Sequence, residues 1–227
     1  MKEIPVKGVI FDFDGTLIDS YQALFLAFRH TYENMGLAPL SAEEVRRVLG
    51  HGVASTFQDL LGEERVPEAM KLFRQEYEEV MRPHTQLLPG AREVIETLHG
   101  RGIQLAIATN KLGYFARELS EYYGLDKLIA VIVGDGDVSQ NKPDPEMLLH
   151  AIEKMRLKKE EVIFVGDSPI DIQTGKNAGV RVFAVPTGGT QREDLEKAQP
   201  TLILDRLLDL LYTASLFLAR DGPKSSL

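Results

Sequence analysis

Four short apolar runs recur along the chain, and each has the length and composition of a buried β-strand. They are rich in valine, isoleucine and alanine, and turn-forming residues stand beside them. These runs cover residues 6–10, 103–108, 131–133 and 161–165. Between the first and second runs lies a long stretch, residues 31–82, with many charged and helix-forming residues and no strand-like alternation. That stretch predicts a small helical bundle.

Polar or acidic residues follow each apolar run directly. In open parallel α/β sheets, ligands bind at the carboxyl edge, where the strands end. The pattern therefore predicts a Rossmann-like parallel sheet with a binding site along that edge. The residues placed there are Asp12 and Asp14, Thr109 and Asn110, Asp135, Asp137 and Lys142, and Asp167 and Asp171.

The two acids after the first run indicate a metal site. Asp12 and Asp14 stand two residues apart, and Gly15 breaks the chain out of the strand. Two neighbouring carboxylates repel each other unless a cation or a shared proton lies between them. Mg²⁺ takes oxygen ligands and often uses only one or two carboxylates. A solvated, aspartate-rich turn is the alternative, and the polar groups after the other strands favour the metal site.

Composition narrows the class of protein. The chain has 227 residues, enough for one core with a small satellite domain, and its formal net charge of −8 argues against a general nucleic-acid binder. It has no cysteine, which excludes disulfides and zinc–thiolate sites. Residues 202–219 are apolar but carry three charges, so they fall short of a membrane span, and residues 1–5 lack the apolar stretch of a signal peptide. We expect a cytoplasmic protein that binds neither membrane nor nucleic acid.

Four segments resemble, in order, the motifs of the haloacid dehalogenase superfamily of phosphatases. They are FDFDGTLIDS at 11–20, ATN at 108–110, NKPDP at 141–145 and GDSPIDI at 166–172. The chain is most similar to the phosphoglycolate-phosphatase-like branch, in which a helical cap is inserted just after the first motif. The resemblance implies a Rossmann-like α/β core formed by residues 1–18 and 85–227, and a small helical cap domain at residues 19–84.

The resemblance also implies a Mg²⁺-dependent phosphatase that works through an aspartyl-phosphate. Asp12 lies closest to the strand end and would be the nucleophile, and Asp14 would be the general acid and then the general base. Mg²⁺ would be held by the Asp12 side chain, the Asp14 backbone carbonyl and the Asp167 side chain. Asp171, one helical turn after Asp167, would contact a metal-bound water or ligand rather than the metal.

The same resemblance assigns the phosphate oxygens to Thr109, the Asn110 backbone and Lys142. Each of these residues also has an ordinary structural interpretation. Thr109 and Asn110 in isolation form a plain turn, and most lysines are exposed loop residues. Their shared position at strand ends favours the phosphate site, because hydroxyls, backbone N–H groups and an ammonium are what that anion needs.

The loop Gly50-His51-Gly52 is the best sequence indication of substrate. Its glycines let the backbone approach a small ligand, and His51 would donate to the carboxylate of phosphoglycolate. A flexible turn with a solvated imidazole fits the residues equally well. Since no arginine or lysine lies between residues 49 and 62, the remaining partners for a strongly anionic distal group are Arg46, Arg47, Arg82 and Lys111.

We therefore expect a phosphoglycolate-phosphatase-like enzyme that acts on a small phosphorylated metabolite, as a monomer or a homodimer. A pyrophosphatase or a sugar-phosphate phosphatase is the first alternative. A phosphomutase comes next, because it would share Asp14. A non-catalytic phosphate-binding module comes last, because such a protein should have lost one of Asp12, Asp14, Lys142 or Asp167, and this chain retains all four.

Overall fold

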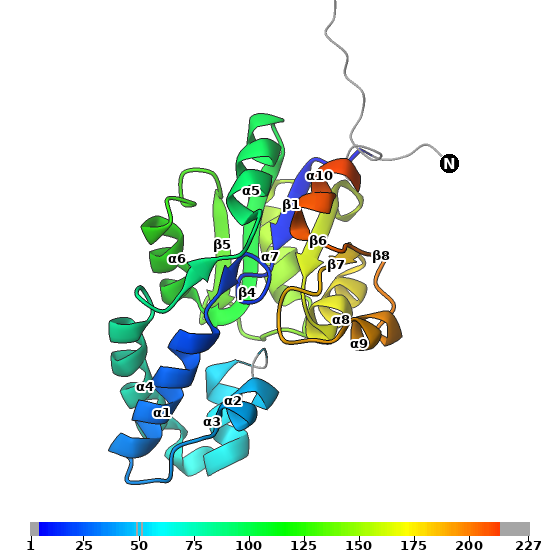
Figure 1. Cartoon of the computed structure of the whole chain (residues 1–227). Helices are drawn as coiled ribbons and strands as arrows, with labels where there is room; N and C mark the ends of the chain where they lie inside the picture. Colours follow the sequence, from blue (N-terminus) through cyan, green and yellow to red (C-terminus); the bar gives the residue numbers. More distant parts are fainter. Residues whose placement is uncertain (1–4, 49, 51, 214–227) are drawn as a thin grey trace, which may run out of the picture.

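A six-stranded sheet forms the centre of the computed structural model, which describes residues 5–48, 50 and 52–213 (Figure 1). Every neighbouring pair of its strands runs parallel. The strand order is β5-β4-β1-β6-β7-β8, which confirms the predicted Rossmann-like α/β class. The strands are β1 (Gly8–Phe11), β4 (Gln104–Leu112), β5 (Val131–Asp135), β6 (Val162–Gly166), β7 (Arg181–Ala184) and β8 (Leu202–Ile203).

Helices cover both faces of the sheet. In β1, Val9 and Phe11 pack into one hydrophobic core while Ile10 packs into the other. Strands buried on both faces need apolar residues at every position, which explains the continuous apolar runs. The first core takes in α5 (Ala91–Gly100), α6 (Gly113–Tyr122) and α10 (Leu210–Thr213), and the second takes in α7 (Glu146–Met155), α8 (Pro169–Ala178) and α9 (Arg192–Lys197).

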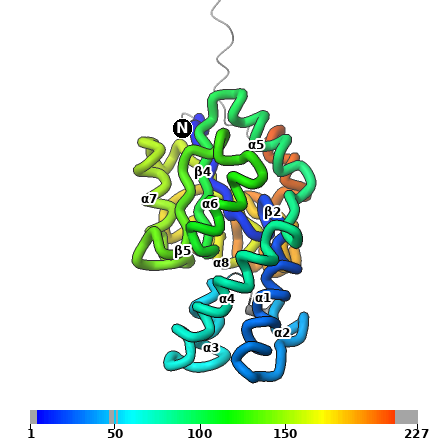
Figure 2. The backbone as a smooth tube through the Cα atoms, turned by 90° about the vertical axis from the view of Figure 1, so that its left-hand side faces the viewer, coloured from blue at the N-terminus to red at the C-terminus, as the bar shows by residue number. Residues whose placement is uncertain are grey.

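Four helices form a separate group beyond the carboxyl ends of the strands (Figures 1 and 2). The chain enters and leaves this group through two short antiparallel strands, β2 (Ile18–Asp19) and β3 (Gln86–Leu87). Among the residues that the structure describes, no helix is both long and apolar enough to cross a membrane. The division into domains at residues 18/19 and 84/85 stays a prediction. The helices are α1 (Tyr21–Asn34), α2 (Ala42–Val48), α3 (Val53–Leu61) and α4 (Val66–Val80).

The second apolar run continues further than its composition suggests. β4 runs to Leu112, so Thr109 and Asn110 lie within the strand rather than after it. The pairing of β4 with β5 shifts register between Ala108 and Leu112, and this irregularity turns the polar residues out of the regular ladder. α6 then begins directly at Gly113.

Candidate active site

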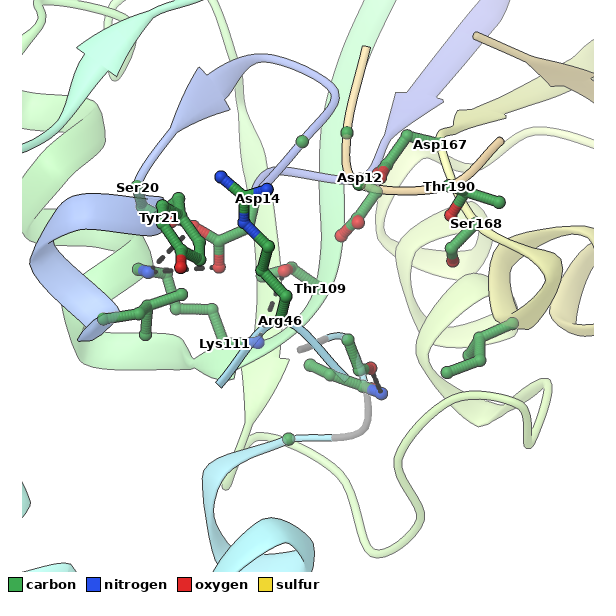
Figure 3. Close-up of a pocket in the computed structure, with 18 of the residues that line it drawn as sticks. Asp12, Asp14, Ser20, Tyr21, Arg46, Thr109, Lys111, Asp167, Ser168 and Thr190 are labelled. Atoms are coloured by element: carbon green, nitrogen blue, oxygen red, sulfur yellow. Dashed lines mark hydrogen bonds and ion pairs between the residues drawn. The ribbon is translucent and has the colours of Figure 1, made fainter. Parts of the chain in front are cut away.

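A cavity of about 1130 Å³ lies between the carboxyl edge of the sheet and the helices α1–α4. Both sides contribute to its lining: the sheet edge supplies Asp12, Thr109 and Asp167, and the helices supply Tyr21 and Arg46 (Figure 3). Parallel strands bring their carboxyl ends to one edge, so residues far apart in sequence meet here. Most of the predicted site residues therefore gather at this cavity. Asp135 and Asp137, which the sequence pattern places at the same edge, do not line it, and Asp137 instead pairs with Arg117 at 2.7 Å.

Three buried aspartates form a cluster beside this cavity, and two of them, Asp12 and Asp167, line it. Asp12 follows β1, Asp167 follows β6, and Asp171 stands in the first turn of α8. One carboxylate oxygen from each lies within 4.8 Å of the others. Because β1 and β6 pair in register, Phe11 opposite Val165, the residues that follow them meet at the edge. Figure 3 shows Asp12 and Asp167 side by side.

Lys142 partly neutralises this cluster. Its Nζ lies 2.8 Å from Asp12 Oδ1 and 2.6 Å from Asp171 Oδ1. Three carboxylates thus face one ammonium, which leaves an excess of two negative charges when all are ionised. Burial raises the pKa of Asp12 to about 6, against the Lys142 ammonium, which lowers it. Burial, then the charges of Asp171 and Asp12, raise the pKa of Asp167 well above its usual range.

The donor set fits a divalent cation. Hard cations take carboxylate oxygens, and an excess of two negative charges matches their charge. Within the described part of the chain, Asp12 Oδ1 has no hydrogen-bond donor correctly aligned with it, although Lys142 is close. Glycines surround Asp167: a Cβ added at Gly188 would lie 1.8 Å from Asp167 Oδ2, and one at Gly15 would lie 2.5 Å from it. The chain keeps this space clear around the carboxylate.

Asp14 lies in a separate polar network next to the cluster. Lys111 Nζ donates to Asp14 Oδ1 at 3.0 Å and to Oδ2 at 3.1 Å, and Ser20 Oγ also donates to Oδ1. The same Nζ lies 2.6 Å from the hydroxyl of Tyr77 on α4. Lys111 is buried, and its pKa is raised because Asp14 and Tyr77 outweigh its loss of solvation. Asp14 itself remains partly exposed to the cavity.

Thr109 and Asn110 reach the same edge by different contacts. Both are buried, and Thr109 Oγ1 accepts from Lys111 N at 3.3 Å. Asn110 Oδ1 accepts from Lys142 N at 2.8 Å, and Asn110 Nδ2 donates to Lys142 O at 3.1 Å and to Gly50 O at 2.9 Å. The Asn110 side chain therefore fixes the backbone that carries Lys142 and connects it to the loop between α2 and α3.

His51 lies outside the described residues. The glycines beside it are described, and both have positive φ angles, 96° for Gly50 and 92° for Gly52. Both also line the cavity. A Cβ at Gly52 would lie 3.7 Å from Asn110 O, so this glycine lies close to the sheet edge. Whether His51 contacts a substrate stays a prediction.

Two features of the site have little or no signal in the sequence. The sequence indicates Lys111 only as one of several cations that could bind an anionic group at the far end of a substrate. The structure instead pairs it with Asp14. Its position directly after Asn110 is the one local indication of this pairing. Tyr77 stands in the middle of an amphipathic helix and reads as an ordinary core residue. Its contact with Lys111 depends on how α4 packs against the sheet edge.

Comparisons with known proteins agree with this site. The family model for haloacid dehalogenase-like hydrolases matches residues 9–185. Phosphoglycolate phosphatase 1 of Pseudomonas aeruginosa is 33% identical over 215 residues, covering 91% of this chain and 79% of that relative. A pyrophosphatase of Halalkalibacterium halodurans is also 33% identical, over 210 residues, covering 91% and 95% of the two chains. The crystal structure of a predicted phosphoglycolate phosphatase from Haemophilus somnus superposes with a TM-score of 0.84 at 26% identity, covering 92% and 97%. The chain belongs to the haloacid dehalogenase-like hydrolases.

Proposed function

We propose that this hydrolase is a Mg²⁺-dependent phosphatase that cleaves a small phosphomonoester through an aspartyl-phosphate on Asp12. The observation that carries the proposal is the pair Asp12 and Asp14 in two different surroundings. Asp12 is buried among Asp167, Asp171 and Lys142. Asp14, two residues later, is partly exposed and hydrogen-bonded to Lys111 and Ser20. Such a division suits one carboxylate for attack and another for proton transfer.

In this mechanism the Asp12 carboxylate oxygen attacks phosphorus, and the P–O bond to the leaving group breaks as the new bond forms. Asp14 donates a proton to the leaving oxygen. Asp14 then takes a proton from a water that attacks the phosphorus of the aspartyl-phosphate, which releases inorganic phosphate and restores Asp12. Thr109, the Asn110 backbone and Lys142 would hold the non-bridging oxygens in place during both steps.

The metal-binding residues in this proposal are Asp12, Asp167 and the backbone carbonyl of Asp14. A bound Mg²⁺ would supply positive charge where a carboxylate and a phosphate must approach each other. Asp171 is assigned to supporting contacts, because it already accepts from Lys142 and from Ser168 N and Oγ at the start of α8. The helices in residues 19–84 would form the cap that covers this site.

Phosphoglycolate is the substrate that the comparisons favour, because several relatives at about this identity carry the name phosphoglycolate phosphatase. Pyrophosphate is the second candidate, since the Halalkalibacterium halodurans relative is a pyrophosphatase. Both compounds are small and carry a second anionic group beside the phosphate to be cleaved. The cytoplasmic location and the choice between monomer and homodimer stay predictions from the sequence.

The test is release of inorganic phosphate from phosphoglycolate, pyrophosphate, sugar phosphates and an aryl phosphate, with and without Mg²⁺. We expect metal-dependent release concentrated on one compound and abolished in Asp12→Asn, which keeps the size of the side chain but removes the nucleophile. Release that persists in Asp12→Asn would contradict the covalent mechanism. A folded protein that releases no phosphate from any compound would contradict the proposed function, and isomerisation of a sugar phosphate would indicate a mutase.

A further inference from the structure

Arg46 of α2 lies in the same cavity as the proposed catalytic aspartates. Its side chain is exposed, and its guanidinium carbon stands 4.6 Å from the centre of the Tyr21 ring. The Tyr21 hydroxyl donates to Ala42 O at 2.9 Å, which ties this ring to the start of the helix that carries Arg46. Stacking on the ring holds the guanidinium in place while its N–H groups stay open to the cavity.

The other described cations that line the cavity already have carboxylate partners. Lys142 contacts Asp12 and Asp171, and Lys111 contacts Asp14. Lys197 lies 2.7 Å from Asp194. Among the lining residues that the structure describes, Arg46 is the cation that has no ion pair with a carboxylate. It is therefore free to bind an anion that enters.

Arg46 also lies on the side of the cavity where a leaving group must extend. Asp14 marks the position of the leaving oxygen, because it is the group proposed to protonate that atom. Ser20 donates to Asp14, and the next residue is Tyr21, on which Arg46 stacks. Figure 3 shows Arg46 reaching from the cap side toward Asp14, Ser20 and Tyr21. A leaving group that points away from phosphorus therefore passes Asp14 toward the guanidinium.

We infer that Arg46 binds the anionic group at the far end of the substrate, a carboxylate or a second phosphate. The inference rests on the proposed function and specifies its substrate class: phosphomonoesters or anhydrides whose leaving group is itself negatively charged. A guanidinium suits this task because its planar N–H groups match the two oxygens of a carboxylate or phosphate. A cation at this end of the cavity attracts such a group and so sets the orientation of the substrate.

The structure also separates Arg46 from the other cations that the sequence offers for this task. Arg82 pairs with Glu118 and is not among the lining residues. Lys111 is buried under Asp14 and Tyr77. The side chain of Arg47 lies outside the described residues.

The experiment compares kcat/KM of the full-length enzyme and its Arg46→Gln variant on three compounds. Phosphoglycolate and pyrophosphate carry a distal anion, and 2-hydroxyethyl phosphate has similar size but a neutral end. We expect Arg46→Gln to lower kcat/KM about 10- to 100-fold for whichever anionic compound the wild type cleaves, since a charge-assisted contact is lost. The value for 2-hydroxyethyl phosphate should change less than about twofold. Arg46→Lys should recover part of the loss, because it restores the charge without the planar fork.

Arg65→Gln is the matched control, because Arg65 lies in the short segment between α3 and α4 and does not line the cavity. It should leave all three values unchanged. An equal loss on charged and neutral compounds, or no loss on either, would overturn the assignment of Arg46 while leaving the phosphatase intact. Absence of cleavage of all three compounds by the wild type would instead count against the proposed function. Calorimetric binding of phosphoglycolate to Asp12→Asn, with and without Arg46→Gln, should show the same 10- to 100-fold difference in affinity.

Discussion

At the scale of single residues, the site depends on space as much as on charge. The Asp167 carboxylate is positioned by a distant residue, because Thr16 Oγ1 donates to its Oδ1 at 3.0 Å, and nearby glycines leave room around it. A Cβ added at Gly188 would lie only 1.8 Å from Asp167 Oδ2. Any larger residue there must displace either the loop after β7 or the carboxylate itself.

Gly188→Ala should therefore weaken metal binding while the fold is retained. We expect the added methyl group to move Asp167 and to lower Mg²⁺ affinity about 10- to 100-fold, as changes beside metal ligands commonly do. Titration calorimetry with Mg²⁺ measures this directly. Gly189→Ala is the control, since a Cβ at Gly189 would meet no heavy atom within 4 Å. Equal Mg²⁺ affinity in the two variants would contradict this view of Gly188.

At the scale of secondary-structure elements, a hydrogen bond from Lys111 of β4 to Tyr77 connects that strand to α4. Tyr77 of α4 packs against Phe73 and Phe115, so its ring is fixed by aromatic neighbours. Its hydroxyl contacts Lys111 Nζ at 2.6 Å, and the same ammonium donates to Asp14. Burial, more than any neighbouring charge, raises the pKa of the Tyr77 hydroxyl, so it stays neutral in this contact. The helix thus helps to hold the lysine that positions Asp14.

Tyr77→Phe should reduce stability by about 1–3 kcal/mol, because a buried charged donor loses a partner while the ring packing is kept. We also expect a lower kcat, since Lys111 would hold Asp14 less firmly. Urea unfolding and phosphate release measure the two effects. Tyr32→Phe is the control: Tyr32 is buried in α1, and its hydroxyl has no hydrogen bond to another residue in the described part of the chain. If both variants lose the same stability, the contact with Lys111 contributes nothing specific.

The same elements show which parts of the site can be predicted from sequence. Asp12 and Asp167 are predictable as neighbours, because each directly follows one of two adjacent parallel strands that end at the same edge. Lys142 stands several residues beyond the end of β5, so the strand pattern alone does not place it beside Asp12. The partners of Lys111 are not predictable, since Asp14 is 97 residues away and Tyr77 is 34 residues away, on a helix whose packing no local pattern specifies. The extension of β4 to Leu112 is not predictable either, because Thr109, Asn110 and Lys111 resemble a turn by composition.

At the scale of the whole molecule, the proposed ligands connect parts of the chain that meet only when it is folded. Asp12 follows β1 and Asp167 follows β6, and the two strands lie at the centre of the sheet. Without a cation, the cluster of three buried carboxylates is only partly compensated by Lys142. An unfolded chain cannot bring these residues together, so a cation that binds here binds the folded state alone.

Mg²⁺ should therefore raise the melting temperature of the protein. At a free concentration 100 times its dissociation constant, a ligand specific to the folded state stabilises it by about 2.7 kcal/mol. For a chain of this length that corresponds to a rise of roughly 5–10 °C, measured by circular dichroism or calorimetry. Asp167→Asn should lose most of this rise, because it removes a proposed ligand, and sodium chloride of equal ionic strength should not reproduce it. The proposal would be contradicted if Mg²⁺ left the melting temperature of the wild type unchanged. It would also be contradicted if Mg²⁺ raised the melting temperature of Asp167→Asn as much as that of the wild type. Either result would show that these carboxylates do not hold the metal.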